Sequence, residues 1–230
     1  TLSFKEGVTV NDIILVRSGK DLIIRIAGTS DQITIWNQHW TQDSGDVFGT
    51  GRIENFVFVD GTVWTALDVD NRLLAAAQSP GNDDVLGYET ADTLDGGAGN
   101  DALHGLRGND VYVFGRGYGQ DTIAEDNGSS GDLGDRLVFR DGVAPTDIEI
   151  TRSGYDVTLK IVGTNDQVTL DHQVWSTDSA AALGSNRIES VVFADGTIWT
   201  AAELDARVLL AQGTNGNDTI VGFASNDFID

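Results

Sequence analysis

The sequence predicts an all-β fold in which a parallel β-roll lies between β-hairpin modules, each closed by one short helix. Three observations predict it: a nine-residue rhythm of glycine and aspartate in the middle of the chain, apolar–polar alternation on either side, and a long internal repeat. The chain has 28 glycines and only 2 prolines, a composition that suits β structure with many tight turns.

The central stretch 81–123 repeats a nine-residue pattern. Asp83, Asp92, Asp101 and Asp110 recur at intervals of nine, and an apolar or aromatic side chain stands two residues after each. A glycine usually stands two residues before the aspartate, and glycine permits the positive φ angles of a tight turn. Each period therefore predicts one turn and one short strand whose apolar residue points inward, as in the pattern G-G-x-G-x-D-x-U-x.

Two periods return the chain to the same edge of such a structure. Stacked strands lie about 4.8 Å apart, so we expect Asp83 and Asp101 one coil apart on one edge, and Asp92 and Asp110 on the other. Calcium takes oxygen ligands at about 2.3–2.6 Å, so one ion fits between two such carboxylates. Without an ion each pair repels by roughly 3 kcal/mol at an effective dielectric near 20. Aspartate also occurs in turns without metal, but the strict register favours a roll that needs Ca2+ as its cofactor.

These repeats resemble those of the RTX (repeats-in-toxin) proteins, the haemolysin-type calcium-binding family, and the run GNDVYVFGRGYGQDTI resembles the end of such a repeat block. The resemblance implies a region of a large bacterial protein that is secreted unfolded by type I secretion and folds into a β-roll in extracellular calcium. It implies metal ligation at the aspartate positions, with Asp121 included after a two-residue insertion. The expected metal-site residues are Asp83, Asp92, Asp101, Asp110, Asp121, Gly81, Gly87, Gly96, Gly97, Gly99, Gly105 and Gly108. Three residues depart from the glycine positions of the pattern: Tyr88, Thr90 and Leu106.

Composition excludes several classes of partner. The chain has 36 acidic and 14 basic residues and a formal charge of −22, which repels nucleic acid and anionic membranes and suits divalent cations. It has no cysteine and therefore no disulfides or thiol chemistry. No run of eighteen apolar residues occurs, so we expect no direct membrane insertion. The chain lacks methionine and an opening signal peptide, and we expect it to be a piece of a longer protein.

Residues 1–95 align without gaps with 136–230 at a constant offset of 135, and roughly two-fifths of the aligned positions are identical. RSGKDLIIRIAGTSDQITI corresponds to RSGYDVTLKIVGTNDQVTL, for example. The expected domains are a β module with a C-terminal helix (1–79), the roll (80–127), a linker (128–135), a second such module (136–213) and the start of a further, truncated roll (214–230). In that last segment Asp218 and Asp227 lack partners on a next coil, and we expect weak binding there.

Period-two alternation predicts the strands of each module. In the second copy they fall at 148–151, 157–161 and 167–170, and a hairpin from Ile188 to Trp199 turns at Asp195-Gly196. Thr200 with Glu203 forms a capping-box pattern that predicts a helix. RSG, GT-DQ and FADGT-W make the modules resemble the haemolysin-type calcium-binding related region that accompanies such rolls.

The sequence does not predict an enzyme. His39 and His172 stand at positions that differ between the two copies, and His104 stands at the variable last position of a nonapeptide. We expect surface or strand-edge histidines. No G-x-S-x-G, H-E-x-x-H or phosphate-binding motif is present. Glu54 and Glu189 each follow Arg-Ile, where a structural Arg–Glu pair is the simpler account.

The tryptophans leave a second function open. Trp40/Trp175 and Trp64/Trp199 occur in both copies, and Trp36 only in the first. We expect them in the core, but exposed tryptophans stack on sugar rings, so a calcium-dependent carbohydrate-binding or adhesive module with a glycan or cell-surface ligand is the alternative.

The segment 126–135, DNGSSGDLGD, is expected to be a polar solvated loop, with a further cation site as the alternative. We therefore expect a secreted calcium-triggered folding and spacer module, whose partners are calcium ions and neighbouring repeats of the parent protein. Lyase or epimerase chemistry would belong to another part of that protein.

Overall fold

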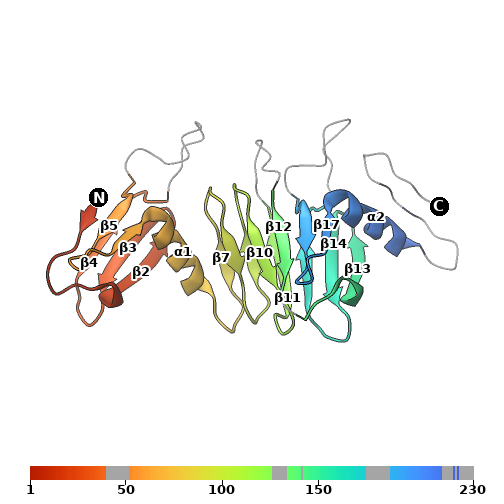
Figure 1. Cartoon of the computed structure of the whole chain (residues 1–230), viewed down its shortest axis with the longest axis horizontal. Helices are drawn as coiled ribbons and strands as arrows, with labels where there is room; N and C mark the ends of the chain where they lie inside the picture. Colours follow the sequence, from red (N-terminus) through yellow and green to blue (C-terminus); the bar gives the residue numbers. More distant parts are fainter. Residues whose placement is uncertain are drawn as a thin grey trace. The chain divides into compact units, whose positions relative to one another are not determined.

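The computed structural model describes residues 1–39, 52–125, 134–140, 142–174, 187–213, 220 and 222. Over these residues the chain forms seventeen β-strands and two α-helices, which confirms the all-β prediction (Figure 1). The chain divides into two compact units, Thr1–Ala76 and Ala77–Asp230, here called the first and the second unit. In the described part of the chain, neither helix combines the length and the apolar character needed to cross a bilayer.

The first unit contains two three-stranded sheets, in the orders β1-β5-β6 and β2-β3-β4. Its elements are β1 (Leu2–Ser3), a 3-10 turn (Val10–Asp12), β2 (Ile13–Ser18), β3 (Asp21–Ile26), β4 (Gln32–Ile35), β5 (Asn55–Val57), β6 (Val63–Thr65) and α1 (Ala66–Ala77). β1 is parallel to β5, and the other neighbouring pairs are antiparallel. Side chains from β3, β5, β6 and α1 form one buried core.

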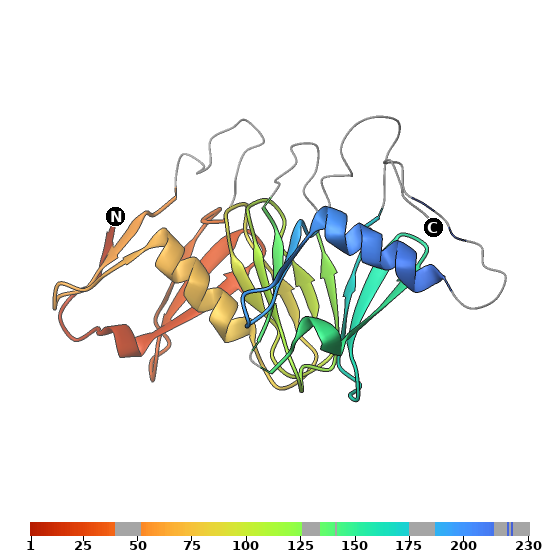
Figure 2. The ribbon, with the colours of Figure 1, turned by 45° about the vertical axis from the view of Figure 1, so that its right-hand side comes forward.

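The second unit contains a six-stranded sheet, β13-β14-β15-β11-β9-β7, and a five-stranded sheet, β17-β16-β12-β10-β8. Its strands are β7 (Asp84–Leu86), β8 (Thr93–Asp95), β9 (Ala102–His104), β10 (Val111–Phe114), β11 (Gln120–Ala124), β12 (Arg136–Phe139), β13 (Ile148–Ser153), β14 (Asp156–Ile161), β15 (Gln167–Leu170), β16 (Ser190–Val192) and β17 (Ile198–Thr200). A 3-10 turn (Pro145–Asp147) precedes β13, and α2 (Ala201–Gln212) closes the unit. α2 packs against β13, β16 and β17 (Figure 2).

Successive strands of the glycine-rich stretch alternate between these two sheets. β7, β9 and β11 lie side by side in one sheet and β8, β10 and β12 in the other, and all these neighbours are parallel. The register brings the pattern's apolar positions together, with Val85 opposite Leu103 and Leu94 opposite Tyr112. These four side chains are buried, so the short strands direct the expected residues inward.

Both sheets continue from this stretch into the second module. β15 is parallel to β11, and β16 is parallel to β12. The remaining strands of the module then join in antiparallel fashion. The glycine-rich stretch and the second module therefore share one core, while the domain boundaries drawn from the sequence stay a prediction.

The two modules are built alike, as the internal repeat predicts. Each of β2 to β6 and α1 has a counterpart exactly 135 residues later with the same bounds, from β13 to β17 and α2. The predicted capping box of α2 is confirmed, because the Glu203 N–H donates to Thr200 Oγ1 at 3.3 Å and the Thr200 N–H donates to Glu203 Oε2 at 2.8 Å. Thr65 and Asp68 form the same reciprocal pair at the start of α1.

Candidate metal centre

Three of the predicted aspartates form a ladder along one edge of the parallel strands. The Asp83 N–H donates to Asp101 Oδ1 at 2.8 Å, and the Asp101 N–H donates to Asp121 Oδ1 at 3.1 Å. The Ser79 N–H donates to Asp83 Oδ2 at 2.6 Å and ends the ladder. Asp83 and Asp101 stand directly before β7 and β9, and Asp121 stands within β11. The carboxylates of Asp101 and Asp121 each accept from the coil before, as expected for aspartates that stack one coil apart.

A second ladder runs along the opposite edge. The Asp92 N–H donates to Asp110 Oδ1 at 2.8 Å, so the second predicted pair is also brought together. The ladder then continues beyond the residues that the pattern picks out. The Asp110 N–H donates to Asp135 Oδ1 at 2.7 Å, and the Asp135 N–H donates to Glu189 Oε2 at 2.8 Å.

The sequence analysis missed Asp135 and Glu189 as members of this ladder. Asp135 is fully buried, so the solvated-loop interpretation of its segment is wrong at this residue; residues 126–133 lie outside the described part. One signal was present: Asp135 stands before Arg-Leu-Val-Phe as Asp110 stands before Val-Tyr-Val-Phe. Glu189 has an identical counterpart in the first copy, Glu54.

Several of the predicted glycines leave room for these carboxylates. A Cβ at Gly96 would collide with the Asp101 carboxylate, and a Cβ at Gly105 would collide with that of Asp110. A Cβ at Gly99 would strike both the Gly81 carbonyl oxygen and Asp101 Oδ1. The turns therefore bring backbone carbonyls and carboxylates against the same small space.

Three other predicted glycines have different reasons to be glycine, whereas a Cβ at Gly81 would meet nothing closer than Ser79 Oγ at 3.5 Å. At Gly87 a Cβ would lie 2.7 Å from the Gly105 carbonyl oxygen, and at Gly108 it would lie 2.6 Å from that of Thr90. Gly97 has room for a side chain but a φ of +82°, which only glycine adopts without cost. Leu106, which replaces an expected glycine, has a φ of +71°, so the turn keeps its geometry there at the expense of strain.

Calcium fits the first ladder. Asp101 Oδ2 and Asp121 Oδ2 are buried and have no hydrogen-bond partner among the described residues. A buried carboxylate oxygen is costly unless a donor, a proton or a cation neutralises it. All the available donors, carboxylates and glycine carbonyls, are oxygens, which is the ligand set of Ca2+.

Burial also raises the pKa values of carboxyl groups at both edges. Burial raises the pKa of Asp121 to about 7, although the hydrogen bond from the Asp101 N–H opposes the rise. Burial raises the pKa of Glu125 to about 9 against the effect of the Tyr112 hydroxyl, and the charge of Asp135 adds to the rise. Burial also raises the pKa of Glu189 to about 7. These carboxyls therefore lie where negative charge is unfavourable unless a cation is bound.

The histidine prediction is wrong for His39. Its side chain is buried, with Nδ1 3.1 Å from Asp70 Oδ1, because α1 places Asp70 inside the first unit. His104 and His172 have partly exposed side chains, as expected.

The Arg–Glu pairs expected from the sequence are also wrong. Arg52 pairs with Asp70, and Arg187 pairs with Asp205 at 3.0 Å. Both partners come from the helix that packs over the arginine, a long-range contact that the local Arg-Ile-Glu sequence does not contain.

The tryptophans shared by the two copies are core residues where the structure describes them. Trp64 and Trp199 are 7% and 3% exposed and contact Phe58 and Phe193 edge to face, with ring centroids 4.8 and 4.7 Å apart. Trp36 is 74% exposed. Trp40, Trp175, Asp218 and Asp227 lie outside the described residues.

Comparisons with known proteins agree with the two kinds of region. The model of the "Haemolysin-type calcium binding protein related domain" matches residues 21–68 and 156–203. The model of the "RTX calcium-binding nonapeptide repeat (4 copies)" matches residues 79–112 and 210–230. A curated relative, "Iron-regulated protein FrpA" from Neisseria meningitidis serogroup C, is 33% identical over 115 residues, which are 50% of this chain and 10% of that protein. The chain thus spans a small part of its relative, and the cofactor prediction, calcium, is confirmed.

Proposed function

Because the chain is an RTX repeat protein with calcium-binding nonapeptides and two haemolysin-type calcium binding protein related domains, we propose that it is a calcium-triggered folding and spacer region of a large secreted bacterial protein. In this proposal residues 80–127 form a calcium-stabilised parallel β-roll. The alternation of parallel strands between two sheets supports it, and so does the stacking of the aspartates at intervals of one coil.

The proposed calcium ligands are the paired aspartates with the turn carbonyls beside them. Asp101 belongs to two pairs, with Asp83 and with Asp121, and Asp92 pairs with Asp110. The observation that carries the proposal is the pair of buried oxygens, Asp101 Oδ2 and Asp121 Oδ2, that no described residue satisfies. The hydrogen-bonded ladder fixes Oδ1 of Asp101 and of Asp121 and leaves Oδ2 of both for an ion.

Calcium supplies the positive charge that makes this burial favourable. The chain's own residues do the rest: the main-chain N–H groups orient the carboxylates, and the glycines keep side chains out of the turns. Extracellular modules of this kind bind with dissociation constants of about 10⁻⁴–10⁻³ M, so calcium near millimolar adds on the order of 1 kcal/mol per site. At the far lower calcium of a bacterial cytosol, the charge of −22 keeps the chain expanded and fit for export.

A calcium titration of the chain followed by far-UV circular dichroism tests the proposal. We expect β signal to appear cooperatively between chelator and millimolar calcium, and Asp101→Ala to shift the midpoint to higher calcium. Asp60→Ala is the matched control, because Asp60 stands in an exposed hairpin turn and bonds the Thr62 N–H. An identical spectrum with and without calcium would overturn the mechanism.

A calcium-dependent carbohydrate-binding module is the second candidate. Trp36 favours it, since its ring is 74% exposed and exposed indole rings stack on sugars. A glycan array with the chain and its Trp36→Ala variant tests this function, and equal, background binding by both in calcium would exclude it for this residue.

A further inference from the structure

Three buried carboxylates meet where the glycine-rich stretch joins the second module. Asp110 precedes β10, Glu125 follows β11 and Asp135 precedes β12. One oxygen from each lies within 4.8 Å of the others, and all three residues are buried. The chain thus brings three acids from three strand ends into one small space.

Glu125 is the residue whose buried carboxylate indicates that a ligand binds there. It is only 5% exposed. No described residue makes a hydrogen bond of good geometry to either carboxylate oxygen, although the Tyr112 hydroxyl lies close enough to interact with the group. Buried carboxylates are normally satisfied by several donors. Glu125 instead faces two further acids, whose positions are fixed by the bond from the Asp110 N–H to Asp135 Oδ1.

The space around these acids is kept open. The Tyr112 hydroxyl and Asp110 Oδ2 both lie where a Cβ on Gly105 would stand, so only glycine fits at that turn. Tyr112 itself is fully buried, and its hydroxyl adds a neutral oxygen to the carboxylates. The donor set is again made of oxygen atoms alone.

We propose that Asp110, Glu125 and Asp135 bind a Ca2+ ion at a junction site between the last coil and the second module. It rests on the proposed function, because it shares Asp110 with a nonapeptide pair, but Glu125 and Asp135 belong to no nonapeptide. The site is tied to the module through the Asp135 N–H, which donates to Glu189 just before β16. Calcium bound there fixes the register in which the module stacks on the roll.

Counting bound ions tests the junction site. Calorimetric calcium titration of the chain is compared with that of Glu125→Gln, which keeps the shape and removes one charge. Asp84→Asn is the control, because Asp84 makes the same charge change on a side chain that is 81% exposed. We expect Glu125→Gln to bind one ion fewer than the control and to keep the nonapeptide sites.

The outcomes separate the junction site from the proposed function. An unchanged ion count in Glu125→Gln, with a reduced count in Asp101→Ala, overturns the junction site alone. Unchanged counts in both variants overturn the proposed function as well. If Glu125→Gln does not fold in calcium, Glu125→Asp keeps the charge on a shorter arm, and we expect one ion to bind at least 10-fold more weakly. Unchanged affinities in that variant also overturn the site.

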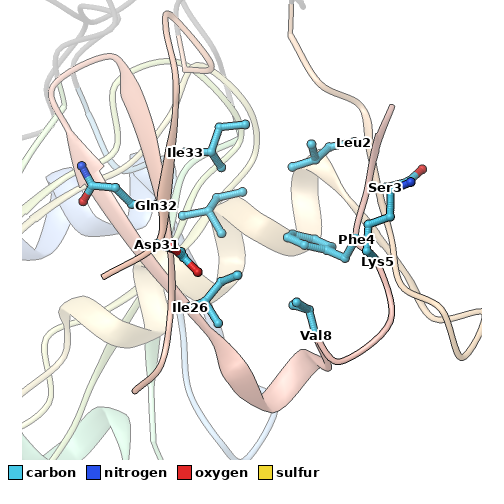
Figure 3. A pocket seen from close by; sticks show the side chains of 10 residues that line it. Leu2, Ser3, Phe4, Lys5, Val8, Ile26, Asp31, Gln32 and Ile33 are labelled. Atoms are coloured by element: carbon cyan, nitrogen blue, oxygen red, sulfur yellow. The ribbon is translucent and has the colours of Figure 1, made fainter. Parts of the chain in front are cut away.

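A separate observation concerns an apolar groove in the first unit. Leu2, Phe4, Val8, Ile26 and Ile33 line a groove of about 320 Å³, and Figure 3 shows their side chains facing it from the chain segments on both sides. β1 and β4, which bound it, are outer strands of their sheets. Ile33 is 43% exposed, which is unusual for an inward strand position.

The second module shows what covers the same positions. The five residues 135 positions later are at most 3% exposed: Leu137, Phe139, Val143, Ile161 and Val168. There β12 and β15 correspond to β1 and β4, and they pair with β10 and β11. The last coil of the glycine-rich stretch therefore lies against both of these strands.

One polar and one aromatic residue of the second module also contact the coil. Asp166 accepts the Gly117 N–H at 2.9 Å and the Gly119 N–H at 3.0 Å, whereas its counterpart Asp31 is exposed. Phe139 lies between two rings, with centroids 6.1 Å from Phe114 and 5.1 Å from Phe193.

The first unit has only part of this arrangement. Phe4, the counterpart of Phe139, stacks on Phe58 with centroids 4.6 Å apart. Phe58 corresponds to Phe193. Among the described residues of the first unit, Phe4 therefore has the counterpart of Phe193 beside it but no counterpart of Phe114, the ring that the coil contributes.

We infer that the groove receives the last coil of a nonapeptide roll, with its strand parallel to β4 and a Gly-x-Gly turn against Asp31. The register is that of β11 on β15, where Gln120 is opposite Gln167, so the same glutamine position would lie opposite Gln32. The occupant is a roll joined before the module, in the way that residues 80–135 are joined before Arg136.

An extended chain tests this docking. A copy of residues 80–135 is joined directly before Thr1, which reproduces the natural junction, and amide hydrogen exchange is measured in calcium. The Gln167 and Asp171 N–H groups donate to the coil at 2.8 and 2.9 Å, so we expect their counterparts, Gln32 and Trp36, to exchange at least 10-fold more slowly in the extended chain. Asp31→Ala should reduce that protection in the extended chain and leave the original chain unchanged.

Equal exchange of these two amides in both chains overturns the docking site. Concentration-dependent protection in the original chain would show that a second copy fills the groove, and would equally overturn a roll as its occupant.

Discussion

The backbone N–H of Asp101 donates to Oδ1 of Asp121, and Asp101 Oδ1 in turn accepts the N–H of Asp83. Asp101 is thus the middle of its ladder, and its second oxygen is buried without a partner. We expect Asp101→Ala to lower the free energy of unfolding in saturating calcium by about 2 kcal/mol, because hydrogen bonds to charged groups contribute about 1.5–3 kcal/mol. Urea unfolding at fixed calcium measures this. Asp84→Ala is the control, and equal losses in the two variants would contradict the central role of Asp101.

In the calcium-free chain, stability should fall as the pH rises. Burial raises the folded-state pKa of Asp121 to about 7 from 3.8, and that of Glu125 to about 9 from 4.5. Between the unfolded and folded values the folded chain binds more protons, so the free energy of unfolding decreases with pH. We expect stability in chelator to be greater at pH 5 than at pH 8, and calcium to reduce the difference. Far-UV circular dichroism in chelator across this range measures the folded fraction; a folded fraction that rises with pH would contradict the raised pKa values.

Asp166 and Asp31 form a matched pair for substitution. Asp166 accepts two glycine N–H groups from the turn before β11, and losing it leaves both donors without that acceptor at a cost of about 1–3 kcal/mol. Asp31 is exposed at the same position of the first copy, where we expect a change within about 0.5 kcal/mol. Urea unfolding of Asp166→Ala and Asp31→Ala compares them, and equal effects would show that the bonds to the turn contribute nothing.

Leu106 should tolerate replacement by glycine. Its φ of +71° costs a residue with a Cβ about 1–2 kcal/mol, which offsets the loss of its side chain and the greater chain entropy of glycine. We expect Leu106→Gly to change the free energy of unfolding by less than about 1 kcal/mol. Gly97→Ala, at a φ of +82° with no close contact, should destabilise by about 1 kcal/mol. Thermal unfolding in calcium tests both, and a larger loss in Leu106→Gly than in Gly97→Ala would contradict the strain.

The features that the sequence predicted are those with a period. The offset of 135 and the two-residue alternation located the module strands, and the nine-residue spacing brought Asp83 to Asp101 and Asp92 to Asp110. These contacts are encoded locally, because the turn geometry repeats at every coil.

The features that the sequence missed depend on the packing of distant segments. Asp110 meets Asp135 across 25 residues, and Asp135 meets Glu189 across 54. Arg187 turns to Asp205 on α2 instead of the nearby Glu189, and Asp70 on α1 buries His39 in the same way. No short-range pattern in the sequence specifies which acidic residue of a helix will pair with a distant arginine.

The continuous parallel pairing from β7 through β11 to β15 has a mechanical consequence. The hydrogen bonds between coils run along the direction in which the coils stack. Tension along that direction therefore peels one strand from the next instead of shearing a whole sheet at once. Under tension the second unit should unfold one coil at a time and refold in the same steps. In the proposed function, a bound calcium ion would set the force needed to unfold each coil.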